Sequence, residues 1–275
     1  MEYTSILLSA LFAGIVATAV TVAIEKWGGL VGGLLGTVPS TIVPAGIGMY
    51  VAGGEEVLIV SMAVVPLGML LNALFLGAWV VIPRWIPNAP YLLWLTAIGA
   101  LAFWSLLGMV FLVLVDELMS DYGVQGVAVG GLCLLIVTAI VFNRRPQPAP
   151  KGTNSVSTLV LVARGLMAAP AIGIAVGLSG LGFPTLAGLA SVFPAIFLTS
   201  MVALWLAQGP TVPQGAAGPM MLGGASVAVY ANLAMWSLPA YGALAGSLIA
   251  WVGSVVGWSL PAFMVLRNHH ASVNG

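Results

Sequence analysis

The chain has 275 residues, of which 61% are hydrophobic and only 5% are charged, and its seven Lys/Arg balance its seven Asp/Glu. Soluble domains carry about 25% charged residues and about 45–50% apolar ones, so this composition excludes a soluble globular protein. It also excludes nucleic-acid binding, because no basic surface exists to neutralise phosphates. The single cysteine, Cys133, excludes a disulfide framework. The composition therefore predicts a polytopic membrane protein.

Apolar runs long enough to cross a bilayer follow one another from the first residues onward. A membrane-spanning helix takes about 20 residues, and the first run is too long for a secretory signal peptide, so we expect an uncleaved first span. Glycine-, proline- and charge-rich breakers separate the runs, and the longest hydrophilic segment is the linker at 143–156. The predicted fold is all-α, with transmembrane helices near 5–24, 28–52, 57–82, 91–115, 124–142, 157–178, 184–208, 212–237 and 241–265.

The charged residues, whose signs did not enter this assignment, divide by sign between the two sides that it predicts. The connections on the side of the C-terminus carry the basic residues Lys26, Arg84, Arg144, Arg145, Lys151 and Arg267. The other side carries the acidic residues Glu2, Glu55, Glu56, Asp116, Glu117 and Asp121. Because basic residues favour the cytoplasmic side, we expect a multi-pass inner-membrane protein with its N-terminus outside and its C-terminus in the cytoplasm.

A short internal repeat links the two halves of the chain. Residues 33–42 read GLLGTVPSTI and residues 188–197 read GLASVFPAIF, so a constant offset of 155 pairs Pro39 with Pro194. Five spans separate the equivalent positions, and this odd number makes the two units antiparallel across the bilayer. Inverted repeats are typical of secondary transporters, although a fold alone does not assign a function. The predicted 4+1+4 arrangement comprises a first repeat at 1–122, a fifth helix with its linker at 123–156, and a second, inverted repeat at 157–275.

The first repeat also resembles a known family. A glycine-rich run that ends Gly-Leu-Leu-x-x-x-Pro, two residues that are hydroxylated or small, an acidic outer loop and a Pro-bearing span are similar to the GlpM-like small membrane proteins. Residues 5–115 resemble one such four-span unit closely and residues 157–265 more loosely. The resemblance implies a fused, inverted duplicate of that unit. It implies no substrate, because the family's own activity is unsettled.

Prolines are expected to break two of the helices at the same depth. Pro39 lies about 11 residues into its span, or roughly 16 Å at 1.5 Å per residue, which is half of a hydrocarbon core of about 30 Å. Pro194 lies at the same depth in the predicted helix 184–208, which enters from the opposite face. Pro44 adds a second predicted break to the helix at 28–52. The hydroxyls beside these breaks are candidates for contact with a solute or cation: Ser40, Thr41, Thr199 and Ser200. Alternatively, they satisfy the kinked backbone locally.

Four further polar residues fall inside predicted spans. Asn72 lies at mid-depth in 57–82, and Ser226 and Tyr230 lie in its counterpart, 212–237. They are expected either to contact a solute or to hold helices together by hydrogen bonds. Arg164 is the only basic residue within a predicted span. It points to a binding role if it faces a cavity, and it is otherwise an interfacial residue whose side chain reaches the cytoplasmic surface.

The motifs and residue types that the sequence lacks narrow the range of possible functions. No predicted span carries Asp or Glu at mid-depth, and the chain has no zinc-ligand set, phosphate-binding loop or catalytic triad. We therefore expect no cofactor and no enzyme, but a secondary transporter or facilitator for a small neutral or weakly charged polar solute. The alternatives are an ion channel, a lipid translocator or a non-transporting structural subunit. The expected partners are the small-molecule or ion substrate and the lipid bilayer, and a homodimer is compatible with both.

Overall fold

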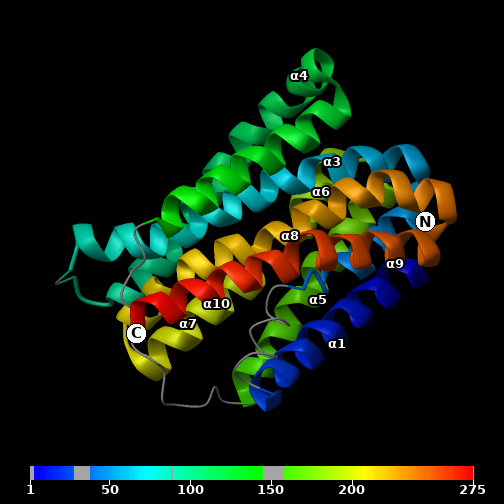
Figure 1. Cartoon of the computed structure of the whole chain (residues 1–275). Helices are drawn as coiled ribbons and strands as arrows, with labels where there is room; N and C mark the ends of the chain where they lie inside the picture. The colour runs from blue at the N-terminus through cyan, green and yellow to red at the C-terminus, as the bar shows by residue number, and fades with distance from the viewer. Residues whose placement is uncertain (1–2, 28–37, 88, 145–157, 275) are drawn as a thin grey trace.

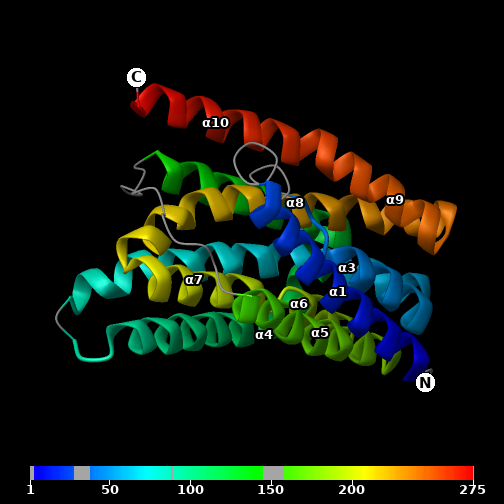
Figure 2. The same cartoon turned by 90° about the horizontal axis from the view of Figure 1, so that it is seen from below.

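The computed structural model describes residues 3–27, 38–87, 89–144 and 158–274. Every regular element within these ranges is helical, which confirms the predicted all-α class. Figures 1 and 2 show the helices lying alongside one another, with the two chain ends at opposite ends of the bundle. The helices are α1 Tyr3–Trp27, α3 Ile42–Trp85, α4 Leu92–Asn143, α5 Thr158–Gly180, α6 Pro184–Ser191, α7 Ala195–Gln208, α8 Thr211–Tyr241, α9 Ala243–Ser254 and α10 Leu260–Asn274, with a π-helical turn, Val255–Ser259, joining the last two.

Several of these helices are long and apolar enough to cross a membrane. The described part of the chain holds five such segments: Ile42–Trp85, Leu92–Asn143, Pro184–Gln208, Thr211–Tyr241 and Ala243–Arg267. Two more apolar helical stretches, Tyr3–Ala19 and Gly165–Gly180, are shorter. The structure therefore agrees with a multi-pass membrane protein, whereas a count by length and composition does not support the nine predicted spans.

Helix α3 turns back on itself at Gly54. Its 44 residues would extend about 66 Å if straight, roughly twice the hydrocarbon core. Gly54 adopts φ 80° and ψ −175°, a conformation outside the helical region that is essentially confined to glycine. A Cβ on Gly46 would lie 3.7 Å from Met62 Cε, although 16 residues of straight helix span about 24 Å. The residues on either side of Gly54 therefore pack against each other as two limbs.

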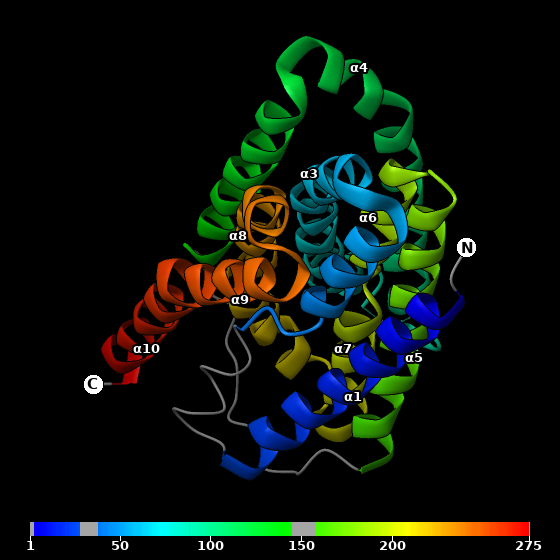
Figure 3. The same ribbon diagram turned by 90° about the vertical axis from the view of Figure 1, so that its right-hand side faces the viewer.

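Helix α4 reverses in the same way at Gly123, which has φ 73° and ψ 159°. A Cβ on Gly108 would lie 3.8 Å from Leu71, and one on Gly131 would lie 3.0 Å from Leu67. Gly108 and Gly131 would be about 35 Å apart in a straight helix, yet they contact residues one turn apart on α3. The reversal is visible as the green tip in Figures 1 and 3. Both reversals fall at boundaries that the sequence predicts.

The two reversals need glycine because of the backbone conformation that it adopts, and not because a side chain would lack room. A Cβ on Gly54 would meet nothing within 4 Å, but the backbone there is strained for any other residue. Gly54→Ala is therefore expected to lower the free energy of unfolding by about 1–3 kcal/mol, measured by thermal or SDS denaturation of the purified protein. Gly130→Ala is the matched control, because that helical glycine also has open space around it and alanine favours the helix. Equal losses in the two variants would contradict the explanation.

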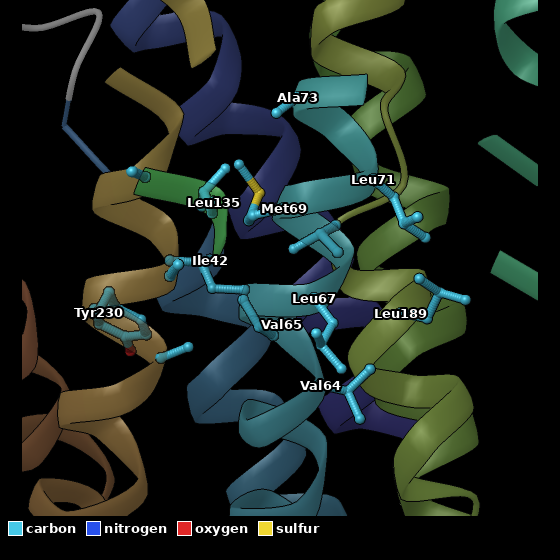
Figure 4. Packing of buried hydrophobic residues seen from close by; sticks show 14 of the residues in the cluster. Ile42, Val64, Val65, Leu67, Met69, Leu71, Ala73, Leu135, Leu189 and Tyr230 are labelled. Atoms are coloured by element: carbon cyan, nitrogen blue, oxygen red, sulfur yellow. The ribbon is translucent and has the colours of Figure 1, made fainter. Parts of the chain in front are cut away.

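The core lies around α3 and α8. Figure 3 shows these helices near the centre, with α4, α5, α1 and the α9–α10 helix around them. Figure 4 shows α3 packed between α8 and α6, with buried Leu, Val, Ile and Met side chains filling the space. The outer helices expose large apolar side chains instead: Val113 of α4 and Leu244 of α9 are each 78% exposed. An apolar surface of this kind on an apolar core is what a bilayer favours over water.

Candidate functional site at the interrupted helix

The stretch from Pro184 to Gln208 is an interrupted helix, as the sequence predicts at Pro194. Helix α6 ends at Ser191, residues 192–194 are not helical, and α7 begins at Ala195. Proline disfavours a helical backbone at the residue before it, so the chain leaves the helix at Val192, whose carbonyl would accept from the Ile196 N–H in an uninterrupted helix. Val192 is only 5% exposed. A carbonyl freed in such a buried, apolar place has to find a partner from another part of the protein.

Asn72 of α3 supplies that partner. Its Nδ2 donates to the carbonyl oxygen of Val192 at 2.8 Å, and its Oδ1 accepts from Trp104 Nε1 of α4 at 2.8 Å. Asn72 is 2% exposed and Trp104 is 7% exposed. The Trp104 ring also lies edge-on to Phe193, with ring centroids 5.5 Å apart. One buried carboxamide therefore joins α3, α4 and the interruption, and both of its ends are engaged.

Helix α6 lies unusually close to α3 beside this hydrogen-bonded group. A Cβ on Gly188 would overlap the carbonyl oxygen of Ser61, and one on Gly68 would overlap the side chain of Val192. Glycine therefore lets the two backbones approach each other. A narrow crevice borders the contact, and its lining is entirely apolar: Val64, Leu67, Gly68, Phe111, Leu112, Val115 and Leu189. The polar chemistry of this region thus resides in Asn72, Trp104 and the Val192 carbonyl.

The first predicted interruption lies at the edge of the described residues. Residues 38–41 are not helical, Pro39 is buried, and α3 begins at Ile42. The predicted second break at Pro44 is wrong. Pro44 lies in the first turn of α3, where the backbone N–H has no helical acceptor in any case, so proline is tolerated. Residues 28–37, the rest of that predicted span, lie outside the described part of the chain.

The hydroxyls predicted beside the two interruptions differ in their contacts. Thr199 Oγ1 donates to the carbonyl of Ala195 at 2.8 Å, and Ser200 Oγ donates to the carbonyl of Ile196 at 2.6 Å. Both therefore satisfy the backbone of their own helix, which is the alternative that the sequence left open. Ser40 and Thr41 are half-buried, and Thr41, the residue directly before α3, makes no capping hydrogen bond with its side chain.

Tyr230 lies in a second buried polar contact, on the other side of α3. Its hydroxyl is 2.6 Å from Ser247 Oγ of α9, and a Cβ on Gly46 of α3 would lie 3.0 Å from the same oxygen. Tyr230 therefore joins α8 to α9 against the beginning of α3. Ser226, one turn earlier on α8, is 1% exposed. Arg164 belongs to α5, but its side chain lies outside the described part of the structure.

The structure thus brings Asn72 to the interruption at Pro194 and Tyr230 to the limb of α3 that follows Pro39. Three partners were not among the predicted site residues: Trp104, Ser247 and the carbonyl of Val192. One signal for Trp104 exists in the sequence. Its indole N–H falls near the middle of the predicted span 91–115, and a buried indole N–H usually finds an acceptor. Nothing comparable marks Ser247, because serine is common in apolar helices.

Comparison with known proteins assigns no relative. No family model, no curated protein and no solved structure matches this chain. The resemblance to GlpM-like proteins therefore stays a prediction from the sequence.

Proposed function

We propose that this chain is a secondary transporter or facilitator rather than an enzyme. It moves a small neutral or weakly charged polar solute through a mid-bilayer site between two inverted four-span units. The observation that carries the proposal is the α6–α7 interruption, where Asn72, from the other unit, holds the buried carbonyl of Val192 at 2.8 Å. Helices broken at mid-depth, with polar groups from the opposite repeat, are the typical substrate sites of such transporters.

The reversals at Gly54 and Gly123 support a nine-pass arrangement. Gly54 divides α3 into a short limb, residues 42–53, and a long one, and Gly123 divides α4 into two limbs that are each long enough to cross the core. The short limb extends only about 18 Å, so it makes one pass together with the rest of the span predicted at 28–52. Counted in this way with α1, α5, α6–α7, α8 and α9–α10, the four limbs give the nine proposed passes. An odd number of passes agrees with the two chain ends at opposite ends of the bundle in Figures 1 and 2. The charge distribution favours an outer N-terminus and a cytoplasmic C-terminus in an inner membrane.

The helix boundaries support the internal repeat over a much longer stretch than the ten-residue motif. With the offset of 155 that the motif sets, the reversal at Gly54 is equivalent to Gly209, which separates α7 from α8. The two glycines have nearly the same backbone, with φ 80° and ψ −175° at Gly54 and φ 82° and ψ 176° at Gly209.

Contacts between equivalent residues support an antiparallel relation of the repeats. A Cβ on Gly14 of α1 would lie 3.2 Å from Ala169 Cβ of α5, and a Cβ on Gly224 of α8 would lie 3.0 Å from Met69 Cε of α3. In both pairs the two partners differ by 155 in number. A residue meets its own equivalent only near a twofold axis, so both helix pairs cross at such an axis.

Two neighbouring contacts follow the same symmetry. A Cβ on Gly173 would lie 3.2 Å from Ala10 Cβ, and one on Gly165 would overlap Thr18 Oγ1. The residues equivalent to Ala10 and Thr18 are Gly165 and Gly173, so the twofold exchange converts one contact into the other. These are the relations expected of inverted repeats, with the proposed solute site near the axis.

The scarcity of charge favours a neutral cargo. Among the described residues, the polar groups nearest the two interruptions are hydroxyls, the amide of Asn72, the Tyr230 phenol and freed backbone, none of which carries a fixed charge. Arg164 would add one if it faces inward. Neutral donors and acceptors of this kind suit a small polar solute that exchanges hydrogen bonds with them. An inward-facing Arg164 would shift the cargo towards an organic anion.

A non-transporting structural subunit is the second candidate. The close approach of Gly188 to the Ser61 carbonyl and the apolar crevice beside it favour this alternative, because a rigid seam moves no solute. A channel or lipid translocator would require a continuous polar path or a groove open to the bilayer. Solute uptake into proteoliposomes separates transport from the structural role directly.

The uptake experiment uses Thr41, the half-buried residue that lies two positions after Pro39 and directly before α3. After a screen of neutral polar solutes by thermal shift and proteoliposome uptake, Thr41→Val is expected to weaken solute binding and uptake about tenfold, the equivalent of about 1.4 kcal/mol. Thr138→Val is the control, because that exposed hydroxyl donates only to the carbonyl of Leu134 on its own helix, at 2.8 Å. Uptake that is unchanged by Thr41→Val would count against a site at the first interruption, and no uptake of any solute would favour the structural subunit.

A further inference from the structure

We infer that Asn72 and Trp104 form a latch that holds the α6–α7 interruption closed, and that its release is the conformational step that exposes this site. The inference rests on the proposed transport function, because a latch needs a motion to control. It is carried by two hydrogen bonds of 2.8 Å in series, from Trp104 Nε1 to Asn72 Oδ1 and from Asn72 Nδ2 to the carbonyl of Val192.

The latch acts on one side of the interruption only. Helix α6 is seated on α3 by the glycine contacts at Gly188 and Gly68, and the latch bonds the carbonyl of Val192, the residue directly after α6. Helix α7 begins three residues later, after Phe193 and Pro194, and the hydroxyls of Thr199 and Ser200 bond within α7 itself. Helix α6 is therefore fixed on α3, and the Val192 carbonyl that follows it is tied to α3 and, through Trp104, to α4. The backbone at Phe193 and Pro194 is the joint about which α7 can move relative to them.

The latch also differs between the two repeats. With the offset of 155, the residue equivalent to Asn72 is Val227. Valine has no hydrogen-bonding side chain, so the second repeat has no carboxamide at this position. The repeat therefore does not require this arrangement wherever a helix is interrupted. A feature that is present in one half alone is suited to bias an alternating motion towards one of its two states.

The ring of Trp104 adds a second element to the latch. It lies edge-on to Phe193, the residue between the bonded carbonyl and Pro194, with centroids 5.5 Å apart. Movement of the joint would break this ring contact and the hydrogen bond to Val192 together. Replacing Trp104 with phenylalanine keeps an aromatic ring there but removes the N–H that holds the Asn72 amide. This variant therefore tests the hydrogen bond with the least change in packing.

The experiment measures exposure of the joint in the folded protein. The sole cysteine is removed by Cys133→Ser, and Ala195→Cys places a reporter at the start of α7, where Ala195 is 2% exposed. Alkylation by N-ethylmaleimide in proteoliposomes is followed by mass spectrometry, because the thiolate forms only where water enters. Trp104→Phe is expected to raise the alkylation rate about fivefold, the shift in the open population expected from losing one hydrogen bond, and Asn72→Ser is expected to raise it further.

The matched control is Trp258→Phe, which removes an indole N–H that donates to the carbonyl of Leu222 at 2.8 Å, away from the interruption. A static role for Asn72 and Trp104 would lower the melting temperature of the variants without raising alkylation above this control, and that result would overturn the latch. Alkylation that rises while no solute is taken up by the parent protein would support the latch and contradict the proposed transport. Should Asn72→Ser fail to fold, Trp104→Phe alone decides.

Discussion

Replacing Asn72 with leucine is expected to lower the free energy of unfolding by about 2–4 kcal/mol, since each buried group left without its partner costs about 1–3 kcal/mol. Two groups lose their partners at once, the Trp104 N–H and the Val192 carbonyl. Neither is free to turn towards water, because Trp104 is 7% exposed and Val192 is 5% exposed. Denaturation in SDS–detergent mixtures, followed by tryptophan fluorescence, measures the loss.

Asn232→Leu is the control for this prediction. The Asn232 amide is half-buried on α8 and donates to the carbonyl of Ala228 on its own helix at 3.0 Å. Its Oδ1 is buried and has no partner among the described residues, so leucine removes an uncompensated acceptor as well as one hydrogen bond. We expect a change of less than about 1 kcal/mol, in line with polar contacts in membrane helices. A loss in this variant as large as that in Asn72→Leu would show that amides in this bundle contribute generically.

The interruptions were predictable from the sequence because their cause is local. Proline lacks an N–H wherever it occurs, and the helix breaks at Pro194 as expected. The error at Pro44 has the same origin. The cost of a proline depends on its distance from the helix start, and the sequence does not mark Ile42 as the first residue of α3. Once the chain is already non-helical at residues 38–41, Pro44 no longer removes a helical hydrogen bond.

The partners of Asn72 were not predictable because their cause is tertiary. Trp104 lies 32 residues and Val192 lies 120 residues from Asn72 along the chain, and only the packing of α3, α4 and α6 brings them together. Apolar windows likewise locate helices without showing which side faces lipid. The mean hydropathy is similar in α3, at the centre of the bundle, and in α4, whose outer side chains are exposed. Hydropathy therefore predicts membrane helices and leaves their neighbours undetermined.

Replacing Gly188 with alanine is expected to destabilise the protein by about 3 kcal/mol, at the upper end of the usual cost of overpacking a core. The added Cβ would overlap the carbonyl oxygen of Ser61 and lie 2.9 Å from Val64 Cβ. Neither neighbour is the mobile end of a long side chain, so α6 itself has to move away from α3. The same denaturation assay, with folded yield from the membrane as a second measure, records the effect.

Gly177→Ala is the matched control on α5, because its Cβ would meet Ile6 Cδ1 at an ordinary 3.6 Å. We expect this change to be neutral or slightly stabilising, as alanine favours a helix over glycine. Similar losses at Gly177 and Gly188 would contradict the proposed close approach of α6 to α3.

The double variant Gly188→Ala with Asn72→Leu tests whether both residues hold the same helix. Gly188 and Asn72 both fix α6 on α3, one through backbone contact and the other through the Val192 carbonyl. If the first substitution already displaces α6, the hydrogen bond to Val192 is lost with it and the second substitution costs less. The sum of the two single losses in unfolding free energy should then exceed the loss in the double variant by about 1 kcal/mol or more, as expected for coupled neighbours. Strict additivity would mean that α6 is held at two independent points, and that releasing Asn72 would leave the helix in place.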